Sequence, residues 1–462
     1  MSCSTTDNDH VMTRRRRFAP KGICVKCKTN RGRIIIRHAA YCKECFEPVL
    51  MAKFRGILDP TINCSEQGLS VRGSLQAPGN LLIGFSGGVG STVLVDLVKC
   101  CYLAPVIPGG PKGGKKHPRK TGRPWNKIFI CYIDCSACYD VDDRTDEVKT
   151  AFENFDENVF EFVPLHLEAC FENGQVIVDL TNEGLPLTSG LASSSDPQTS
   201  LKNYLGSLPT PSSRESSINT LIRLLLLRTA RSRDCSHVLM GTTLTGLSVN
   251  LITSVASGSG FTVGLEKGED WKSHDSQIIR LVLPLREISM KECAAYLHWR
   301  NLSVIPNRRI LLSPSLSREN VKESIGSLTK GFIYGLERDY PSTVNAIVRT
   351  CNKLVSNSTG HGPMQGGIEK WKEHISVRRL EPDGGEDVGR SDLSYLAPHI
   401  CYACNTTFTS LSSRSTRKTG ANGANTQPIL MPLWVASNLK IQQQQPMSQS
   451  KMEEQIRDFL LE

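Results

Sequence analysis

Two cysteine pairs near the start of the chain have the spacing of metal ligands. Cys24 with Cys27, and Cys42 with Cys45, each form a CxxC motif. Two such pairs supply four thiolates, the ligand set of many tetrahedral zinc sites that stabilise a fold. The pattern predicts a structural zinc centre made of Cys24, Cys27, Cys42 and Cys45. A redox pair or chance spacing is the alternative interpretation.

A glycine-rich loop is the second stretch whose residues could do chemistry. It follows the apolar run 81–85 and precedes apolar residues at helical spacing. A glycine turn between a strand and a helix directs backbone N–H groups at an anion, and hydroxyls add further donors. The stretch therefore predicts a phosphate-binding loop, with a purely structural turn as the alternative. The candidate cofactor-binding residues are Ser86, Gly87, Gly88, Gly90, Ser91 and Thr92.

Asp134 is the remaining candidate for a nucleotide contact. It follows the predicted strand Ile128–Ile133, and the carboxyl end of a second parallel strand is a common place for a nucleotide-binding acid. The alternative is a polar residue that ends a strand. Cys135 and Cys138, just beyond it, are expected to be free thiols in a turn.

The elements that must position these residues alternate between strand and helix. Apolar runs predict further strands at 160–167, 237–240 and 280–285, and helical periodicity predicts helices at 46–58, 212–231 and 287–299. Ser212 and Glu215 have the spacing of a capping box. The repeated β–α order predicts an α/β fold, with a doubly wound parallel sheet and helices on both faces.

Shifts in composition predict the domain boundaries. We expect a disordered N-terminus (1–22), a four-cysteine zinc module (23–58), an α/β domain (78–310) with insertions at 105–127 and 182–211, a helical segment with a CxxC (318–405), a low-complexity segment (406–450) and a terminal amphipathic helix (451–462). Residues 187–211 are predicted to be a loop, and the helical segment is predicted to break near Pro341. The late pair Cys401 and Cys404 has no second knuckle, so a second metal there would need distant ligands.

The charge balance favours a polyanionic partner. Lys and Arg number 55 and Asp and Glu 45 in 462 residues, a net charge of +10. The arginines between the cysteine pairs and along 212–233 are either RNA contacts or a solvated surface. The chain has no apolar run that could span a membrane and no secretory signal at its N-terminus. With 17 cysteines expected to be reduced, the sequence predicts a cytoplasmic protein.

Several stretches resemble known families. The loop 86–91 resembles the pyrophosphate loop SGGxDS of the PP-loop ATP-pyrophosphatase superfamily, with Gly90 in place of the aspartate. The paired CxxC knuckles, this loop and Cys401–Cys404 resemble the cytoplasmic tRNA 2-thiolation protein 2 family. So do PSSRESSINTLIRLLLLRTAR (211–231), VLPLREISMKECAAYL (282–297) and the stretch 324–354.

The resemblance implies a PP-loop domain of the adenine nucleotide alpha hydrolase-like type with a zinc-ribbon-like module. It implies a role in 2-thiolation of the wobble uridine in tRNAs for Lys, Glu and Gln. The implied partners are tRNA, a catalytic PP-loop thiolation subunit in a heterodimer and, indirectly, a ubiquitin-like sulfur carrier. ATP is the implied cofactor of the chemistry.

Three departures from the catalytic relatives favour a non-catalytic or weakly catalytic subunit. Gly90 replaces the loop aspartate, the helix 212–231 lacks the relatives' cysteine pair, and Thr245 and Gly246 replace acidic residues. A second hypothesis is a self-sufficient ATP-dependent tRNA sulfurtransferase using Cys135, Cys138 or Cys235. A third is a zinc-bearing RNA-binding scaffold without nucleotide chemistry. Whether the loop still binds ATP stays open.

Overall fold

The structure is a computed structural model. It describes residues 22–36, 39–62, 77–103, 123–153, 159–172, 175–178, 187–188, 196–208, 210–258, 268–272, 278–305, 324–353 and 429–432. The predictions for 1–21, most of 105–127, Cys401, Cys404 and the terminal helix lie outside these residues. Within the described residues, no helix is long and apolar enough to cross a membrane. The chain divides into two compact units, Met1–Ala52 and Lys53–Glu462.

The first unit contains a β-hairpin and the beginning of a helix. Strands β1 (Ile34–Ile36) and β2 (Ala39–Tyr41) pair antiparallel, and helix α1 (Lys43–Ile62) follows and crosses into the second unit. Ile34 and Ile36 are buried while Ile35 is exposed, because successive strand residues face opposite sides. The hairpin therefore has one apolar face and one solvated face.

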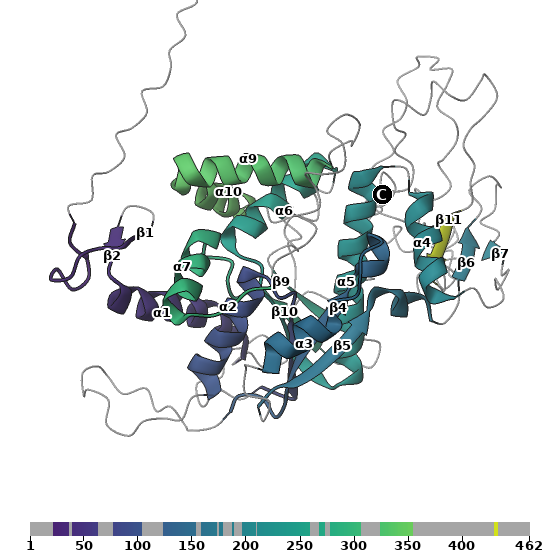
Figure 1. The fold of residues 1–462 in the computed structure, drawn as a ribbon, viewed down its shortest axis with the longest axis horizontal. Coiled ribbons are helices and arrows are strands. Elements are labelled where there is room, and N and C mark those ends of the chain that lie inside the picture. The colour runs from purple at the N-terminus through teal and green to yellow at the C-terminus, as the bar shows by residue number, and fades with distance from the viewer. Residues whose placement is uncertain are drawn as a thin grey trace, which may run out of the picture. The chain divides into compact units, whose positions relative to one another are not determined.

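A six-stranded sheet forms the centre of the second unit (Figure 1). Its strands are β3 (Asn80–Gly84), β4 (Ile128–Asp134), β5 (Glu161–His166), β8 (Cys235–Met240), β9 (Gly268–Lys272) and β10 (Ile278–Val282). Their order is β5-β4-β3-β8-β10-β9, with all neighbours parallel except the edge strand β9. The predicted parallel α/β fold is confirmed, and β9 is an addition that the sequence did not predict.

Helices cover both faces of this sheet. They include α2 (Val89–Val98), α3 (Thr145–Glu153), α5 (Pro211–Ser232), α6 (Leu244–Ala256) and α7 (Met290–Arg300). Leu82 packs against Leu226 of α5, while its neighbours Leu81 and Ile83 face the other side and are also fully buried. Burial of alternate residues on both sides is the signature of a doubly wound sheet.

The segment predicted to be a loop at 187–211 contains a helix instead. Helix α4 (Pro197–Ser207) buries Leu201, Tyr204 and Leu205 against Phe171 of the short helix η3 (Leu167–Phe171). The loop prediction was wrong for α4 because the serines and prolines around it conceal a short apolar stripe at helical spacing. Nearby strands β6 (Gln175–Val178), β7 (Leu187–Thr188) and β11 (Ile429–Pro432) form a separate antiparallel sheet.

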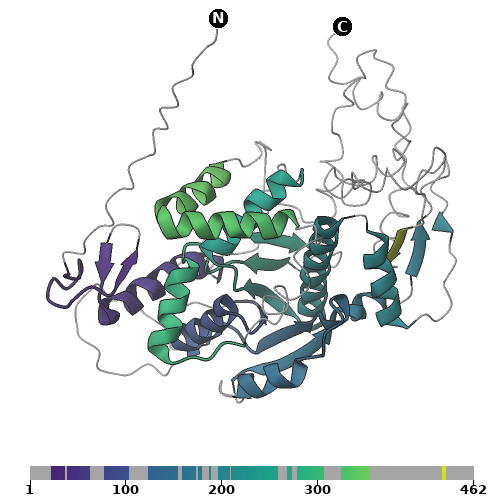
Figure 2. The ribbon, with the colours of Figure 1, turned by 45° about the horizontal axis from the view of Figure 1, so that its top comes forward.

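Two helices in the described range 324–353 pack on α6. Helices α9 (Ile325–Asp339) and α10 (Pro341–Lys353) break at Pro341, as predicted. Ile333 and Val344 join Leu247 in one buried cluster. Figure 2 shows α9 and α10, the two green helices, next to each other at the side of α6.

The predicted capping box of α5 is wrong, because Ser212 and Glu215 bond to another helix. Thr210 is the N-cap, because its side chain accepts a hydrogen bond from Ser213 N at 3.1 Å. Ser212 instead accepts a hydrogen bond from Ile325 N at 3.0 Å, and Glu215 accepts one from the Ser324 hydroxyl. Two stretches that carry the family resemblance are thus joined at the start of α9, a contact that local spacing cannot reveal.

His237, near the start of β8, is a fully buried and neutral imidazole. Its Nε2 lies 3.2 Å from the Thr61 carbonyl oxygen, which can only accept, so Nε2 carries the proton. Its Nδ1 accepts from Ser236 Oγ at 2.9 Å and Trp125 Nε1 at 3.4 Å. Burial, and secondarily the nearby Arg280, lower the pKa of His237 to about 4, against the opposing hydrogen bond to Thr61.

We expect His237 to make the protein less stable in acid. The unfolded imidazole takes up a proton near its ordinary pKa of 6.5, whereas the folded one resists until about 4. The free energy of unfolding should fall by roughly 3 kcal/mol as the pH drops from 6.5 to 4, with the full contribution present above 6.5. Urea unfolding at several pH values, compared with His237→Gln, measures this difference. Equal pH slopes for the two proteins would contradict it.

Candidate functional site

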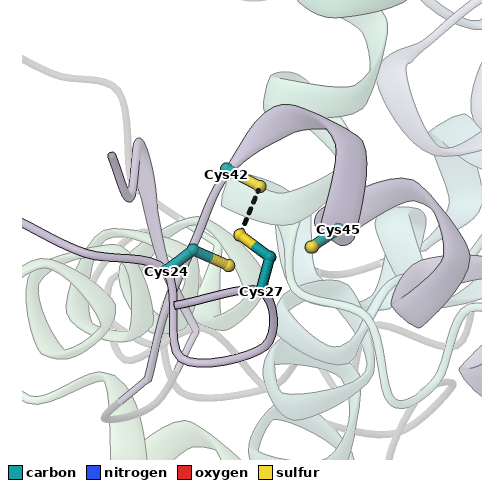
Figure 3. A group of neighbouring side chains, drawn as sticks. All are labelled: Cys24, Cys27, Cys42 and Cys45. Atoms are coloured by element: carbon teal, nitrogen blue, oxygen red, sulfur yellow. Dashed lines mark hydrogen bonds between the residues drawn. The ribbon is translucent and has the colours of Figure 1, made fainter. Parts of the chain in front are cut away.

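The four N-terminal cysteines meet at one point in the first unit (Figure 3). Their sulfur atoms all lie within 4.8 Å of one another, and Cys27 Sγ is 3.8 Å from Cys42 Sγ. Cys24 and Cys27 occupy a tight turn in which Lys28 adopts a φ of 59°, and Cys42 and Cys45 flank the first residues of α1. The structure therefore brings together the predicted ligands, and no ligand of the predicted set lies elsewhere.

The geometry of this cysteine centre suits a single metal ion. Zn–S bonds of about 2.3 Å in a tetrahedron place the sulfurs roughly 3.8 Å apart, which agrees with the separation of Cys27 and Cys42. An iron–sulfur cube would bind each thiolate to a different iron and would hold the sulfurs further apart. A hydrogen bond from the Thr29 hydroxyl lowers the pKa of Cys27 to about 6, whereas burial raises the pKa of Cys42 to about 12. A cation would favour the thiolate at every position.

The glycine loop lies between β3 and α2, as the sequence predicts. Ser86 is exposed at the end of the strand, Gly87 has a φ of 72°, and Gly88 is the N-cap of α2. The hydroxyls of Ser91 and Thr92 are buried, and each donates to the Gly88 carbonyl oxygen at 3.0 Å. These two hydroxyls therefore hold the loop in shape. Ser86 is the exposed residue of the set, and its hydroxyl lies 3.2 Å from the Ser91 hydroxyl.

Gly90 lies where a side chain has no room. A Cβ atom at this position would approach the Gly241 carbonyl oxygen to 2.0 Å, and a Cβ at Gly241 would approach Ser91 N to 2.5 Å. The loop and the end of β8 thus pack backbone against backbone, and neither contact can be relieved by turning a side chain. The aspartate of the related SGGxDS loop could not occupy position 90 without moving β8.

Ile305 covers a second part of the loop. Its backbone N–H donates to the Gly87 carbonyl oxygen at 3.0 Å, and its side chain would lie 2.9 Å from a Cβ placed on Gly87. The first N–H groups of α2 still have no acceptor within the helix, which is the general property that makes a helix start attract anions. The loop therefore keeps the shape of an anion site while its own chain occupies part of the surrounding space.

Asp134 is held by its neighbours at the end of β4. It is buried, and its carboxylate accepts hydrogen bonds from Ser136 N at 2.9 Å, from the Ser136 hydroxyl and from the Tyr132 hydroxyl at 3.3 Å. Its ligand atoms lie within 4.8 Å of those of Asp143 and His166. Sequence reasoning missed these two residues, although His166 ends the adjacent parallel strand in register with Asp134.

Thr245 stands where the resemblance places an acidic residue, and an acid from elsewhere contacts it. The Thr245 hydroxyl donates to Glu337 Oε2 at 2.8 Å and accepts from Met290 N at 3.0 Å. Glu337 belongs to α9, so sequence spacing around Gly241 gave no signal for it. With these two hydrogen bonds, the Thr245 hydroxyl joins α6 to α7 and α9.

The three cysteines that the hypothesis of a self-sufficient sulfurtransferase requires lie in or beside apolar, buried parts of the fold. Cys135 and Cys138 lie in or against the apolar cluster that contains Phe171. Cys235 is fully buried at the start of β8, and burial raises its pKa to about 12. A protonated, buried thiol is a poor nucleophile, so Cys235 does not suit sulfur transfer.

The chain is similar to several known proteins. The family model for cytoplasmic tRNA 2-thiolation protein 2 matches residues 324–456. Relatives with this name include one from Bos taurus, 29% identical over 372 residues (72% of this chain and 68% of the relative). Another, from Homo sapiens, is 26% identical over 383 residues (74% and 68%). A solved structure, the U34-tRNA thiolase NcsA from Methanococcus maripaludis with its 4Fe-4S cluster, is similar with a TM-score of 0.45 and 16% identity, over 75% of this chain and 92% of that one.

Proposed function

We propose, from the similarity of this chain to proteins named cytoplasmic tRNA 2-thiolation protein 2, that it is a subunit needed for 2-thiolation of wobble uridine. The substrates would be the tRNAs for Lys, Glu and Gln, in the cytoplasm. The name of these similar proteins and the span of the match support the reaction. The PP-loop-like arrangement of strand, glycine turn and helix agrees with descent from an ATP-dependent tRNA-modifying domain.

We propose that this subunit does not itself activate the uracil. The observation that carries this proposal is the packing of Gly90 on Gly241, which leaves no space for the loop carboxylate. The burial of Cys235 and the hydrogen bond between Thr245 and Glu337 also support a subunit that does not activate the uracil. A catalytic PP-loop partner, in a heterodimer, would then adenylate the uracil with ATP and receive sulfur from a ubiquitin-like carrier.

The cysteine centre would bind zinc and stabilise the first unit. Cys24, Cys27, Cys42 and Cys45 form a closed four-thiolate set, which leaves no ligand position for a substrate. The basic residues of this chain would add phosphate contacts to tRNA, so affinity should decline as salt is raised. Ser86 and the start of α2 are the part of the loop that a phosphate could still contact.

Nucleoside mass spectrometry of tRNA tests the proposal. Cells that lack the gene should lose wobble 2-thiouridine, and the wild-type gene should restore it. Ser86→Ala should restore it as well if the loop is structural. The change removes the contact between the Ser86 and Ser91 hydroxyls but leaves the hydrogen bonds from Ser91 and Thr92 to the Gly88 carbonyl oxygen. Failure of Ser86→Ala alone, with normal protein levels, would show that the loop binds a phosphate during thiolation.

Purified protein separates the competing functions. The chain alone, supplied with ATP and tRNA, should release no pyrophosphate above background, and the activity should require the partner subunit. Pyrophosphate release by the chain alone would instead support a self-sufficient sulfurtransferase. Unchanged 2-thiouridine in the deletion strain would contradict the thiolation role and leave the zinc-bearing RNA-binding scaffold.

A further inference from the structure

The outer face of α9 is an exposed apolar surface. Leu328 and Phe332, one helical turn apart, are each 58% exposed, although large apolar side chains usually avoid such exposure. Gly331 and Gly335 lie on the same face, and a Cβ on either would meet nothing within 4 Å. These four residues form an α9 outer stripe along which another backbone can approach closely.

A basic line runs beside this stripe. Lys330, Tyr334 and Arg338 follow one another at intervals of four residues, so their side chains lie in a row on the helix. Lys330 Nζ lies 5.8 Å from the centre of the Tyr334 ring, which is 42% exposed. Asp339 places one acidic group at the C-terminal end, and Glu337 is engaged inward by Thr245. The stripe therefore fits an apolar segment with acidic neighbours.

The end of the chain has this composition. Met452, Ile456, Phe459 and Leu460 recur at helical spacing, which gives one apolar face if the segment is helical. Residues 451–462 contain four acids, Glu453, Glu454, Asp458 and Glu462, against the two basic residues Lys451 and Arg457. We propose that residues 451–462 bind the α9 outer stripe of the same chain, with their acids toward Lys330 and Arg338. This inference goes beyond the proposed function and does not depend on it.

The terminal segment is tethered to the described part of the same chain. Residues 433–450 separate the described strand β11 from the segment and, at up to about 3.3 Å per residue, can span roughly 60 Å. A segment tethered in this way has an effective concentration near the millimolar range, so even weak apolar contacts are populated. Burying Leu328 and Phe332 against the apolar residues of the segment supplies such contacts.

Photo-crosslinking in the full chain tests the proposal. Phe332 is replaced by p-benzoylphenylalanine, the protein is irradiated, and joined peptides are identified by mass spectrometry in the monomer band. We expect crosslinks from position 332 to residues 451–462. The same replacement of Tyr139, a 40% exposed aromatic residue outside α9, is the matched control and should give none.

Charge exchange makes the test specific. The double variant Glu453→Lys/Glu454→Lys should reduce the crosslink yield at least fivefold, and so should Lys330→Glu/Arg338→Glu. A protein that carries all four changes should recover at least half of the original crosslink yield. Recovery is expected only for groups that face each other, and a misfolded variant would not show it. Crosslinks in a dimer band, which indicate a second copy, or crosslinks that avoid residues 451–462 would each overturn the proposal.

Discussion

Replacing Gly90 with aspartate is expected to destabilise the α/β domain severely and not to restore a catalytic loop. Any Cβ at position 90 would lie 2.0 Å from the Gly241 carbonyl oxygen, and backbone on both sides prevents local relief. We expect a loss of about 3–5 kcal/mol in the free energy of unfolding. Urea unfolding of the purified protein measures this loss, and Gly90→Ala should show most of it.

Gly88→Ala is the matched control for this prediction. It lies two residues away in the same loop, has a φ of −80°, and its Cβ would meet only the Ser86 hydroxyl at 3.5 Å. That is an ordinary contact, so the change should cost less than about 1 kcal/mol. If Gly90→Asp proved as stable as Gly88→Ala, or gave the isolated chain pyrophosphate-releasing activity, the packing of Gly90 would not be what excludes catalysis.

Removing one ligand of the cysteine centre should unfold the first unit. Cys24→Ser deletes a buried thiolate from a set of four, and the hairpin strands β1 and β2 are only three residues long each. Structural zinc contributes on the order of 10 kcal/mol to small zinc modules, so residues 22–50 should lose their structure. Metal analysis should fall from one zinc per chain to near none, and hydrogen exchange across 22–50 should accelerate.

Cys101→Ser provides the comparison for the metal experiment. Cys101 is a half-buried cysteine outside the centre, so its change should leave the zinc content at one per chain. A chelator should reproduce the Cys24→Ser pattern of hydrogen exchange in the wild-type protein. A Cys24→Ser protein that kept one tightly bound zinc would show that the four cysteines do not form the site.

The sequence by itself determined the features that depend on short segments. The paired CxxC knuckles predicted which four cysteines lie together, because a tight turn and a helix start bring each pair of thiols together locally. Apolar runs and helical periodicity identified the strands of the parallel sheet and the break at Pro341, because these signals arise from neighbouring residues. The position of the loop between β3 and α2 followed in the same way.

The tertiary structure alone decided what surrounds these segments. Gly90 meets Gly241, Gly87 meets Ile305, and Thr245 meets Glu337, and each pair joins parts of the chain that local patterns treat independently. At 187–211 the serines and prolines conceal the apolar stripe of α4, and packing against Phe171 is the tertiary contact that stabilises this helix. Such contacts depend on how the crossovers of the sheet bring distant residues together. A short window of the sequence does not show which distant residue a given residue will contact.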